Sequence, residues 1–158
     1  MINDIDRTHL ARAVDLAEQA LNSGDEPFGS VLVSEKGQVL FEDHNHIASS
    51  GDNTQHPEFS IARWAAANMT PAERAKAVVY TSGEHCPMCA AAHAWVGLGR
   101  VVYASSSEQL SAWLGDMGVP LPPVKTLPIN AVAPAVPVEG PDEELAERVK
   151  TLHARLHG

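Results

Sequence analysis

The order of the expected elements predicts an α/β fold with a mixed sheet. Short apolar and β-branched runs, typical of buried strands, alternate with longer segments whose apolar residues recur at helical spacing. The chain has 158 residues, of which 44% are hydrophobic and 20% are charged, which is typical of one globular domain with one core. We therefore expect residues 1–158 to form a single domain, with residues 119–158 as a C-terminal arm and helix.

The first element is expected to be a helix over residues 4–22, which Gly24 ends. Residues 28–33 form an apolar run that predicts a buried strand, and residues 39–41 begin a second strand after a turn. The inner face of the first helix is expected to comprise Ile5, Leu10, Ala13, Val14, Ala17, Ala20 and Leu21.

A polar loop over residues 43–55 leads to the next helix, which is expected over residues 57–68. Pro57 suits the first position of that helix, because the N–H that proline lacks would be unpaired there. Thr70-Pro71-Ala72-Glu73 is a capping-box sequence and predicts the start of a short helix.

Two further strands flank an alanine-rich helix. Residues 77–81 and 101–104 are short β-branched runs, and the helix between them is expected over residues 86–96, with Gly97 after its end. A short helix is expected over residues 107–114.

Seven prolines lie between Val119 and Pro141. Because proline breaks helices and interior strands, this stretch is expected to be an extended wrap with one short edge strand near residues 129–132. The last helix is expected over residues 142–157. Its inner stripe comprises Leu145, Val149, Leu152 and Leu156.

The charge of the chain argues against nucleic acid as a partner. The 11 Lys and Arg residues and 20 Asp and Glu residues give a net charge of −9, and the basic residues are scattered. No apolar run is long enough to span a membrane, and residues 1–7 lack the basic and apolar regions of a secretory signal. We expect a cytoplasmic location and no membrane partner.

The chemistry of the chain is expected to lie in two short motifs, His56-Pro57-Glu58 and Cys86-Pro87-Met88-Cys89, which contain the only two cysteines. One His and two Cys give zinc three protein ligands and leave its fourth position open, as in catalytic zinc sites. Both motifs stand at the expected start of a helix, where the helix dipole favours thiolates. We therefore predict one zinc ion per chain, bound by His56, Cys86 and Cys89.

Glu58 is the predicted catalytic acid–base, because it follows His56 on the same helix and can take a proton from water and return it to substrate. Two other interpretations stay open from the motifs alone. The cysteines could form a redox pair, or the group could be a non-catalytic zinc module. A redox pair usually follows the first strand, whereas this pair follows the third. His93 is expected to be a pocket or packing residue.

These motifs and their surroundings resemble the cytidine deaminase superfamily, and most closely its small nucleobase deaminases of the guanine deaminase type. The resemblance covers residues 27–113 well. His-x-Glu and Cys-x-x-Cys belong to the whole superfamily, whereas residues 49–54 (Ser-Ser-Gly-Asp-Asn-Thr) and Trp95 point to the guanine type. The resemblance implies a three-layer α/β/α sandwich with a five-stranded mixed sheet, and a homodimer that can exchange C-terminal segments.

The same resemblance implies roles for further residues. Asn45 matches the residue that hydrogen-bonds the base, and Phe28, Glu84 and Trp95 match positions of the substrate pocket. The zinc ligands and the proton shuttle of the family match His56, Cys86, Cys89 and Glu58.

Guanine-type members also use a second acid beyond the fourth strand, for which Asp116 is the first candidate and Glu108 the other. Two positions depart from the pattern, since Pro57 replaces the usual Ala and His85 the usual Pro. Neither departure removes a ligand, so deamination is expected to persist. His85 adds a titratable group beside the zinc, which leaves the preferred substrate open.

The expected function is zinc-dependent hydrolytic deamination of a small free aminated heterocycle, with release of ammonia. Candidate substrates are a guanine-type base and aminopyrimidine or amino-triazine analogues. A tRNA adenosine deaminase is the alternative within the superfamily, and it predicts a basic last helix. That helix is mixed here, with acidic residues at 142, 143, 144 and 147 against basic residues at 148, 150 and 155.

Overall fold

Five strands form one mixed sheet in the order β2-β1-β3-β4-β5, in a computed structural model that describes residues 1–158. β1 is antiparallel to both β2 and β3, whereas β3, β4 and β5 are parallel to one another. The predicted five-stranded mixed sheet and α/β fold are thus confirmed. The strands are β1 (Gly29–Val33), β2 (Val39–His44), β3 (Val78–Gly83), β4 (Val101–Ser105) and β5 (Val138–Glu139).

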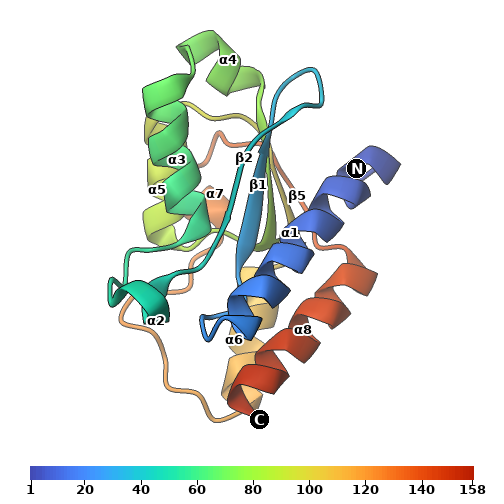
Figure 1. Cartoon of the computed structure of the whole chain (residues 1–158), viewed down its shortest axis with the longest axis vertical. Coiled ribbons are helices and arrows are strands. Elements are labelled where there is room, and N and C mark those ends of the chain that lie inside the picture. Colours follow the sequence, from blue (N-terminus) through green and yellow to red (C-terminus); the bar gives the residue numbers. More distant parts are fainter.

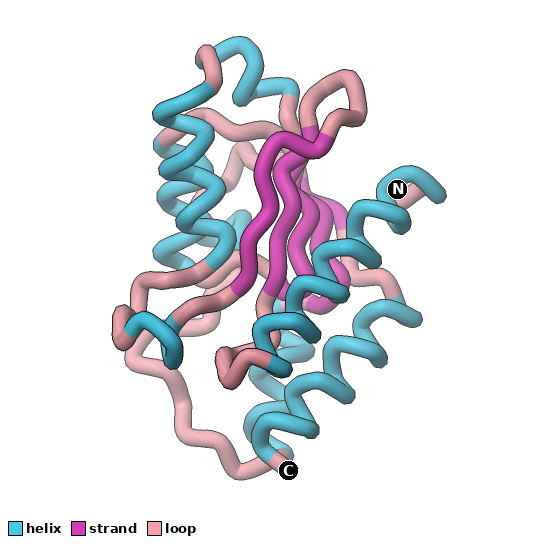
Figure 2. Tube along the Cα trace, viewed as in Figure 1, coloured by secondary structure: helices cyan, strands magenta, loops and turns pink.

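Helices cover both faces of this sheet. Figure 1 shows α3 and α5 on one face and α1 and α8 on the other, and Figure 2 shows the sheet between the two helical layers. None of the helices combines the length and the apolar character that a membrane span requires. They are α1 (Asp4–Asn22), α2 (Ile47–Ser50), α3 (Pro57–Asn68), α4 (Pro71–Lys76), α5 (Pro87–Trp95), α6 (Ser107–Asp116), α7 (Ile129–Val132) and α8 (Glu143–His157).

Both faces of β1 are buried, because successive side chains of a strand point to opposite sides. Val31 packs into the larger core, which lies between the sheet, α1 and α8. Leu32 packs into a second core against Ile61 of α3. Burying each of these side chains stabilises the fold by about 1.5–3 kcal/mol, so the sheet is held from both sides.

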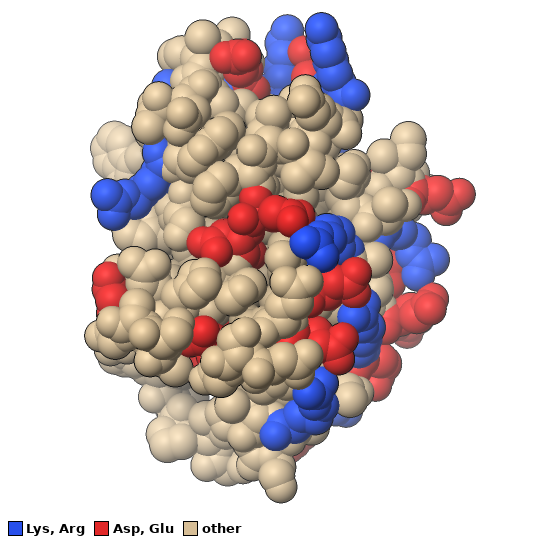
Figure 3. Space-filling view, in the orientation of Figure 1, with Lys and Arg blue, Asp and Glu red and all other residues tan.

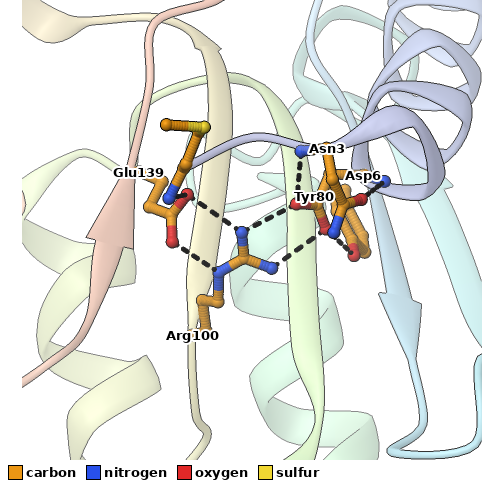
Figure 4. Close-up of polar contacts among 6 residues, drawn as sticks. Asn3, Asp6, Tyr80, Arg100 and Glu139 are labelled. Carbon is orange, nitrogen blue, oxygen red and sulfur yellow. Dashed lines mark hydrogen bonds and ion pairs between the residues drawn. The ribbon is translucent and has the colours of Figure 1, made fainter.

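An ion-pair network joins α1 to the sheet. Arg100, just before β4, donates to both carboxylate oxygens of Asp6 over 2.9 and 2.8 Å and to Glu139 of β5 over 3.2 Å (Figure 4). Tyr80 of β3 donates to the same Asp6 over 2.7 Å. This network explains why Asp6 is buried in α1 while the apolar Ile5, predicted to face inward, is 68% exposed.

The predicted edge strand near residues 129–132 is wrong. Those residues form the short helix α7, and the edge strand is β5, nine residues after the start of that helix. Ile129 is buried, and its N–H donates to the carboxylate of Glu84 over 2.7 Å, which fixes the helix start. β5 begins directly after Pro137, because the residues that follow this proline have N–H groups that can pair with β4.

Three smaller differences concern element ends and loops. The expected polar loop over residues 43–55 contains the end of β2 and the short helix α2. The helix expected to end at residue 114 continues to Asp116. Leu156, expected on the inner stripe of the last helix, is 38% exposed, because α8 extends past the core at its C-terminal end.

Candidate active site

Three potential metal ligands meet where α3 and α5 begin. His56 precedes α3, Cys86 precedes α5 and Cys89 lies in the first turn of α5. Nδ1 of His56 lies 3.6 Å from each sulfur, and the two sulfurs are 3.5 Å apart. A tetrahedral zinc ion with bonds of about 2.3 Å to sulfur and about 2.0 Å to nitrogen needs separations of roughly 3.5–3.8 Å. This ligand triangle therefore fits one zinc ion.

Proline fixes where both helices begin. Pro57 and Pro87 stand in the first turns, where their rings suit helical geometry and the N–H they lack would be unpaired. The remaining unpaired amides and the helix dipoles favour negative charge at this end, and hence thiolate ligands. His56 and Cys86 flank the helices without capping them through their side chains, so both side chains are available to a metal.

The pKa values of the two cysteines shift in opposite directions. Hydrogen bonding with Cys89, together with the contact to His56, lowers the pKa of Cys86 to about 4 despite its burial. The same sulfur contact and burial raise the pKa of Cys89. Cys86 is therefore the thiolate of the pair, and a cation that binds the ligand triangle displaces the proton that remains on Cys89.

Glu58 is buried two residues after His56 on α3, with only 5% of its surface exposed. Its Oε1 accepts hydrogen bonds from the hydroxyls of Thr81, over 3.0 Å, and Ser30, over 3.3 Å. Burial raises the pKa of Glu58, although the neighbouring His56 opposes that rise. A carboxyl group with a raised pKa is suited to accept and return protons.

The ligand triangle and Glu58 lie in a segment that matches a known family. The zinc-binding region of cytidine and deoxycytidylate deaminases matches residues 3–105. The chain belongs to this family. It is a zinc-binding deaminase domain, and its His/Cys/Cys group is able to bind one metal ion.

Relatives of this deaminase act on different substrates according to their names. A probable cytosine deaminase of Schizosaccharomyces pombe is 32% identical over 69% of this chain and 65% of its own length. A guanine deaminase of Bacillus subtilis is 37% identical over 62% of this chain and 63% of its own length. A tRNA-specific adenosine deaminase of Haemophilus influenzae is 28% identical over 70% of this chain and 64% of its own length. This chain thus spans a little under two thirds of each relative.

A solved structure of the guanine deaminase from Bacillus subtilis has the same fold. It superposes with a TM-score of 0.59 at 27% identity, over 81% of this chain and 89% of that one. The similarity thus extends beyond the zinc-binding region into the C-terminal part of the chain.

The structure places Asn45 of the deaminase beside Phe28 and near His56. The N–H of Asn45 donates to the carbonyl of Phe28 over 2.9 Å, and that of His46 donates to the carbonyl of Gln55 over 3.1 Å, which closes the loop back onto His56. Oδ1 of Asn45 accepts from the N–H of Ile47 over 2.9 Å, whereas its Nδ2 donates to no protein group. The amide nitrogen of this buried side chain is therefore available to a ligand.

Two residues expected in the pocket are Trp95, which is exposed, and Glu84, which binds backbone groups of this chain. Trp95 ends α5, at the opposite end of the helix from Cys86, and is 89% exposed. Glu84 accepts hydrogen bonds from the N–H groups of Ser107, over 2.9 Å, and Ile129, over 2.7 Å. These contacts indicate that Glu84 braces α6 and α7 against the loop before α5. A contact between Glu84 and substrate stays a prediction.

Both candidates for the second acid lie on α6 and are exposed. Glu108 is in the first turn of this helix and Asp116 is its last residue. No hydrogen bond or ion pair connects either carboxylate to Glu58 or to the ligand triangle. The second acid stays a prediction.

His85 and His93 pack inside the protein beside the cysteines. Their rings meet edge to face with centroids 5.3 Å apart, and Nε2 of His93 donates to the carbonyl of Gly99 over 2.7 Å. Burial lowers the pKa of His85, so its ring is neutral, and neither of its nitrogens has a hydrogen-bond partner. Neither histidine joins the ligand triangle, as expected for His93.

Sequence reasoning missed the two hydroxyls that hold Glu58. Ser30 and Thr81 face each other on the antiparallel strands β1 and β3, and their hydroxyls are 2.8 Å apart. The available signal was a polar residue inside an otherwise apolar strand, as Ser30 is in β1. A buried hydroxyl needs a hydrogen-bond partner, which would have pointed to a polar site against this part of the sheet.

Proposed function

We propose that this deaminase hydrolyses the exocyclic amino group of a small free heterocycle and releases ammonia. Candidate substrates are a guanine-type base, an aminopyrimidine and an amino-triazine. The observation that carries the proposal is the buried carboxyl of Glu58, held by two hydroxyls beside three metal ligands. His56, Cys86 and Cys89 would hold zinc, which would act as a Lewis acid and lower the pKa of water toward neutral pH.

Glu58 carries the protons in this reaction. Oε1 is occupied by Ser30 and Thr81, which leaves Oε2 to face water and substrate. Glu58 takes a proton from the water that adds to the amino-bearing ring carbon, and passes it to the ring nitrogen. Glu58 then takes the remaining proton of the added hydroxyl and gives it to the amino group, so that the carbon–nitrogen bond breaks, ammonia leaves and the ring carbon keeps the oxygen as a carbonyl. We expect the free amide of Asn45 to hold the ring during these steps, which its unpaired Nδ2 supports.

A small substrate fits the surface of the protein better than a polynucleotide does. The chain has a net charge of −9, and in Figure 3 the basic side chains are dispersed among acidic ones. Polynucleotide binding depends on unpaired basic side chains that neutralise phosphates, and here several arginines already have carboxylate partners. The pairs are Arg7 with Asp142, Arg12 with Glu42, Arg148 with Asp15, and Arg155 with Glu18.

The test is ammonia release from a panel of aminated purines, pyrimidines and triazines. Glu58→Gln is expected to keep its zinc and to lose about 10²-fold or more of the turnover, as is typical when a general acid–base is removed. Glu35→Gln, on an exposed turn, is the matched control and should keep both. Zinc-loaded protein that releases no ammonia from any member of the panel contradicts the proposal.

tRNA adenosine deamination is the second candidate, because a tRNA-specific relative is among those matched. It predicts tight tRNA binding that weakens steeply with salt, together with inosine formation in the bound RNA. Turnover of a free base without salt-sensitive tRNA binding supports the first candidate.

Two further expectations accompany the proposal. The second acid is Asp116 or Glu108, so either Asp116→Asn or Glu108→Gln should lower the turnover while zinc content is unchanged. The protein is expected to be a homodimer, which the 89% exposed Trp95 and the 91% exposed Leu121 support. The mass measured in solution by light scattering decides between monomer and dimer.

A further inference from the structure

A second group of potential metal ligands lies apart from the ligand triangle. Asp25, His44 and His46 each offer one ligand atom, and these atoms lie within 4.8 Å of one another. Asp25 follows α1 in the chain, whereas the two histidines flank Asn45 at the end of β2. None of the three has a role in the proposed deamination.

The end of β2 places both histidines together. β2 ends at His44 and α2 begins after His46, so the short connection between these elements brings the two rings together while Asn45 is buried between them. Their ring centroids are 4.4 Å apart with planes inclined by 33°. Asn45 is 1% exposed, whereas both histidines are half-buried, so the rings stay accessible to an ion from solvent.

Hydrogen bonds select which ring nitrogens can bind a metal. Nδ1 of His44 lies 3.0 Å from the carbonyl oxygen of Asn45, and Nε2 of His46 lies 3.0 Å from a carboxylate oxygen of Asp43. Both oxygens can only accept, so these two nitrogens carry the protons. In the neutral rings, Nε2 of His44 and Nδ1 of His46 keep their lone pairs. A carbonyl or carboxylate on the far nitrogen is the arrangement that orients metal-binding histidines.

Asp25 supplies a fixed carboxylate. It is 1% exposed, and its oxygens accept hydrogen bonds from the N–H and the hydroxyl of Ser49 over 2.8 and 2.9 Å. Each oxygen keeps a further lone pair for a cation.

We propose that Asp25, His44 and His46 form a second metal site, which binds a zinc-like divalent transition metal through one carboxylate oxygen and two imidazole nitrogens. This donor set suits zinc, nickel and copper ions, whereas calcium and magnesium prefer oxygen ligands alone. A tetrahedral zinc ion requires nitrogen and oxygen ligands roughly 3.3–3.5 Å apart, so the half-buried rings would turn inward to close on the ion. A bound ion would fix both neighbours of Asn45.

The test measures zinc bound per chain and does not depend on the proposed deaminase activity. Protein as purified is dialysed to equilibrium against zinc buffered through the micromolar range, and the metal content is measured by elemental analysis. The wild type is expected to reach about two equivalents, one for each donor set. His46→Gln and Asp25→Asn are expected to stop at about one equivalent, since each removes a ligand of the second site only.

His157→Gln is the matched control, because it removes an exposed histidine that belongs to neither group, and it should bind as the wild type does. Protection of Cys86 and Cys89 from a thiol reagent reports the ligand triangle and should be equal in all four proteins, which also shows that the variants fold. The proposal is overturned if the wild type saturates at one equivalent with its thiols protected. It is equally overturned if His46→Gln and Asp25→Asn both retain the second equivalent.

Discussion

Replacing Arg100 by Met is expected to destabilise the protein by leaving a buried carboxylate without its cation. Arg100 donates to both oxygens of Asp6, whose side chain is 4% exposed, and also to Glu139 (Figure 4). Met fills a similar volume but donates no hydrogen bond, so the change removes the charge with little loss of packing.

The loss in the free energy of unfolding can be estimated from the hydrogen bonds that Asp6 keeps. Removing one partner of a buried ion pair typically costs about 3–5 kcal/mol. Arg100 is 25% exposed, and Asp6 retains hydrogen bonds from the N–H of Asn3, over 3.1 Å, and from Tyr80. We therefore expect about 2–3 kcal/mol, or a melting temperature lower by about 4–12 °C for a domain of this size.

Urea unfolding at several pH values measures this effect and its cause. Hydrogen bonds from Arg100 hold the pKa of Asp6 well below its usual value of 3.8, so the pair stabilises the fold above that pH and loses its effect as the pH falls further. The difference between wild type and Arg100→Met should thus shrink below about pH 4.

Asp6→Asn in the Arg100→Met background removes the orphaned charge and is expected to recover part of the stability at neutral pH. A cost below about 1 kcal/mol for Arg100→Met, with no change across the pH series, would show that the ion pair does not hold α1 to the sheet.

Three further predictions test packing, titration and metal binding. Gly29→Ala is expected to cost about 2–4 kcal/mol in urea unfolding, because the added Cβ would lie 2.6 Å from the backbone nitrogen of Ala17. Gly115→Ala, with nothing within 4 Å, should instead be neutral or stabilising, and equal losses would contradict this reasoning. Burial lowers the pKa of His153 to about 4, so the unfolded chain protonates first below about pH 6.5 and the wild type loses about 3 kcal/mol by pH 4. His153→Leu should flatten that part of the pH profile of thermal unfolding, and an unchanged slope would assign it to other groups. Cys89→Ser is expected to bind zinc more weakly by elemental analysis, and unchanged zinc content would contradict its role as a ligand.

Local sequence was sufficient for most helices and for the sheet. The helix expected over residues 57–68 has those bounds in the structure, because proline marks its start and its apolar spacing is visible in the sequence. The capping box at Thr70 likewise forms as expected, with both of its hydrogen bonds present. These signals lie within a few residues of the element they define.

The errors arise where distant residues decide the structure. Residues 129–132 (Ile-Asn-Ala-Val) are short and mostly apolar, which is compatible with either a strand or a helix. Glu84, 45 positions earlier in the chain, binds the N–H of Ile129 and selects the helix. Similarly, Asp6 is buried in place of Ile5 because Arg100, 94 positions later, neutralises it. Neither partner can be recognised from periodicity.

The candidate site divides in the same way. The ligand triangle depends on two motifs at helix starts, so its residues could be named from the sequence. The hydroxyls around Glu58 depend on the register that places Ser30 opposite Thr81, which only the folded sheet defines. The pocket residues rest on the resemblance, and within one chain the structure leaves Trp95 exposed at the far end of α5.

One segment, residues 44–58, links the ligand triangle to the second metal site. It contains two ligands of the second metal site, the amide of Asn45 between them, and then His56 and Glu58. The backbone hydrogen bond from His46 to Gln55 closes the loop inside this segment and holds its two ends together. The position of Asn45 is set by its bond to Phe28 beside the sheet, and the loop then connects it to His56. An ion bound by Asp25, His44 and His46 would anchor this loop to the end of α1, and would thereby couple metal binding at the second site to the geometry of the first.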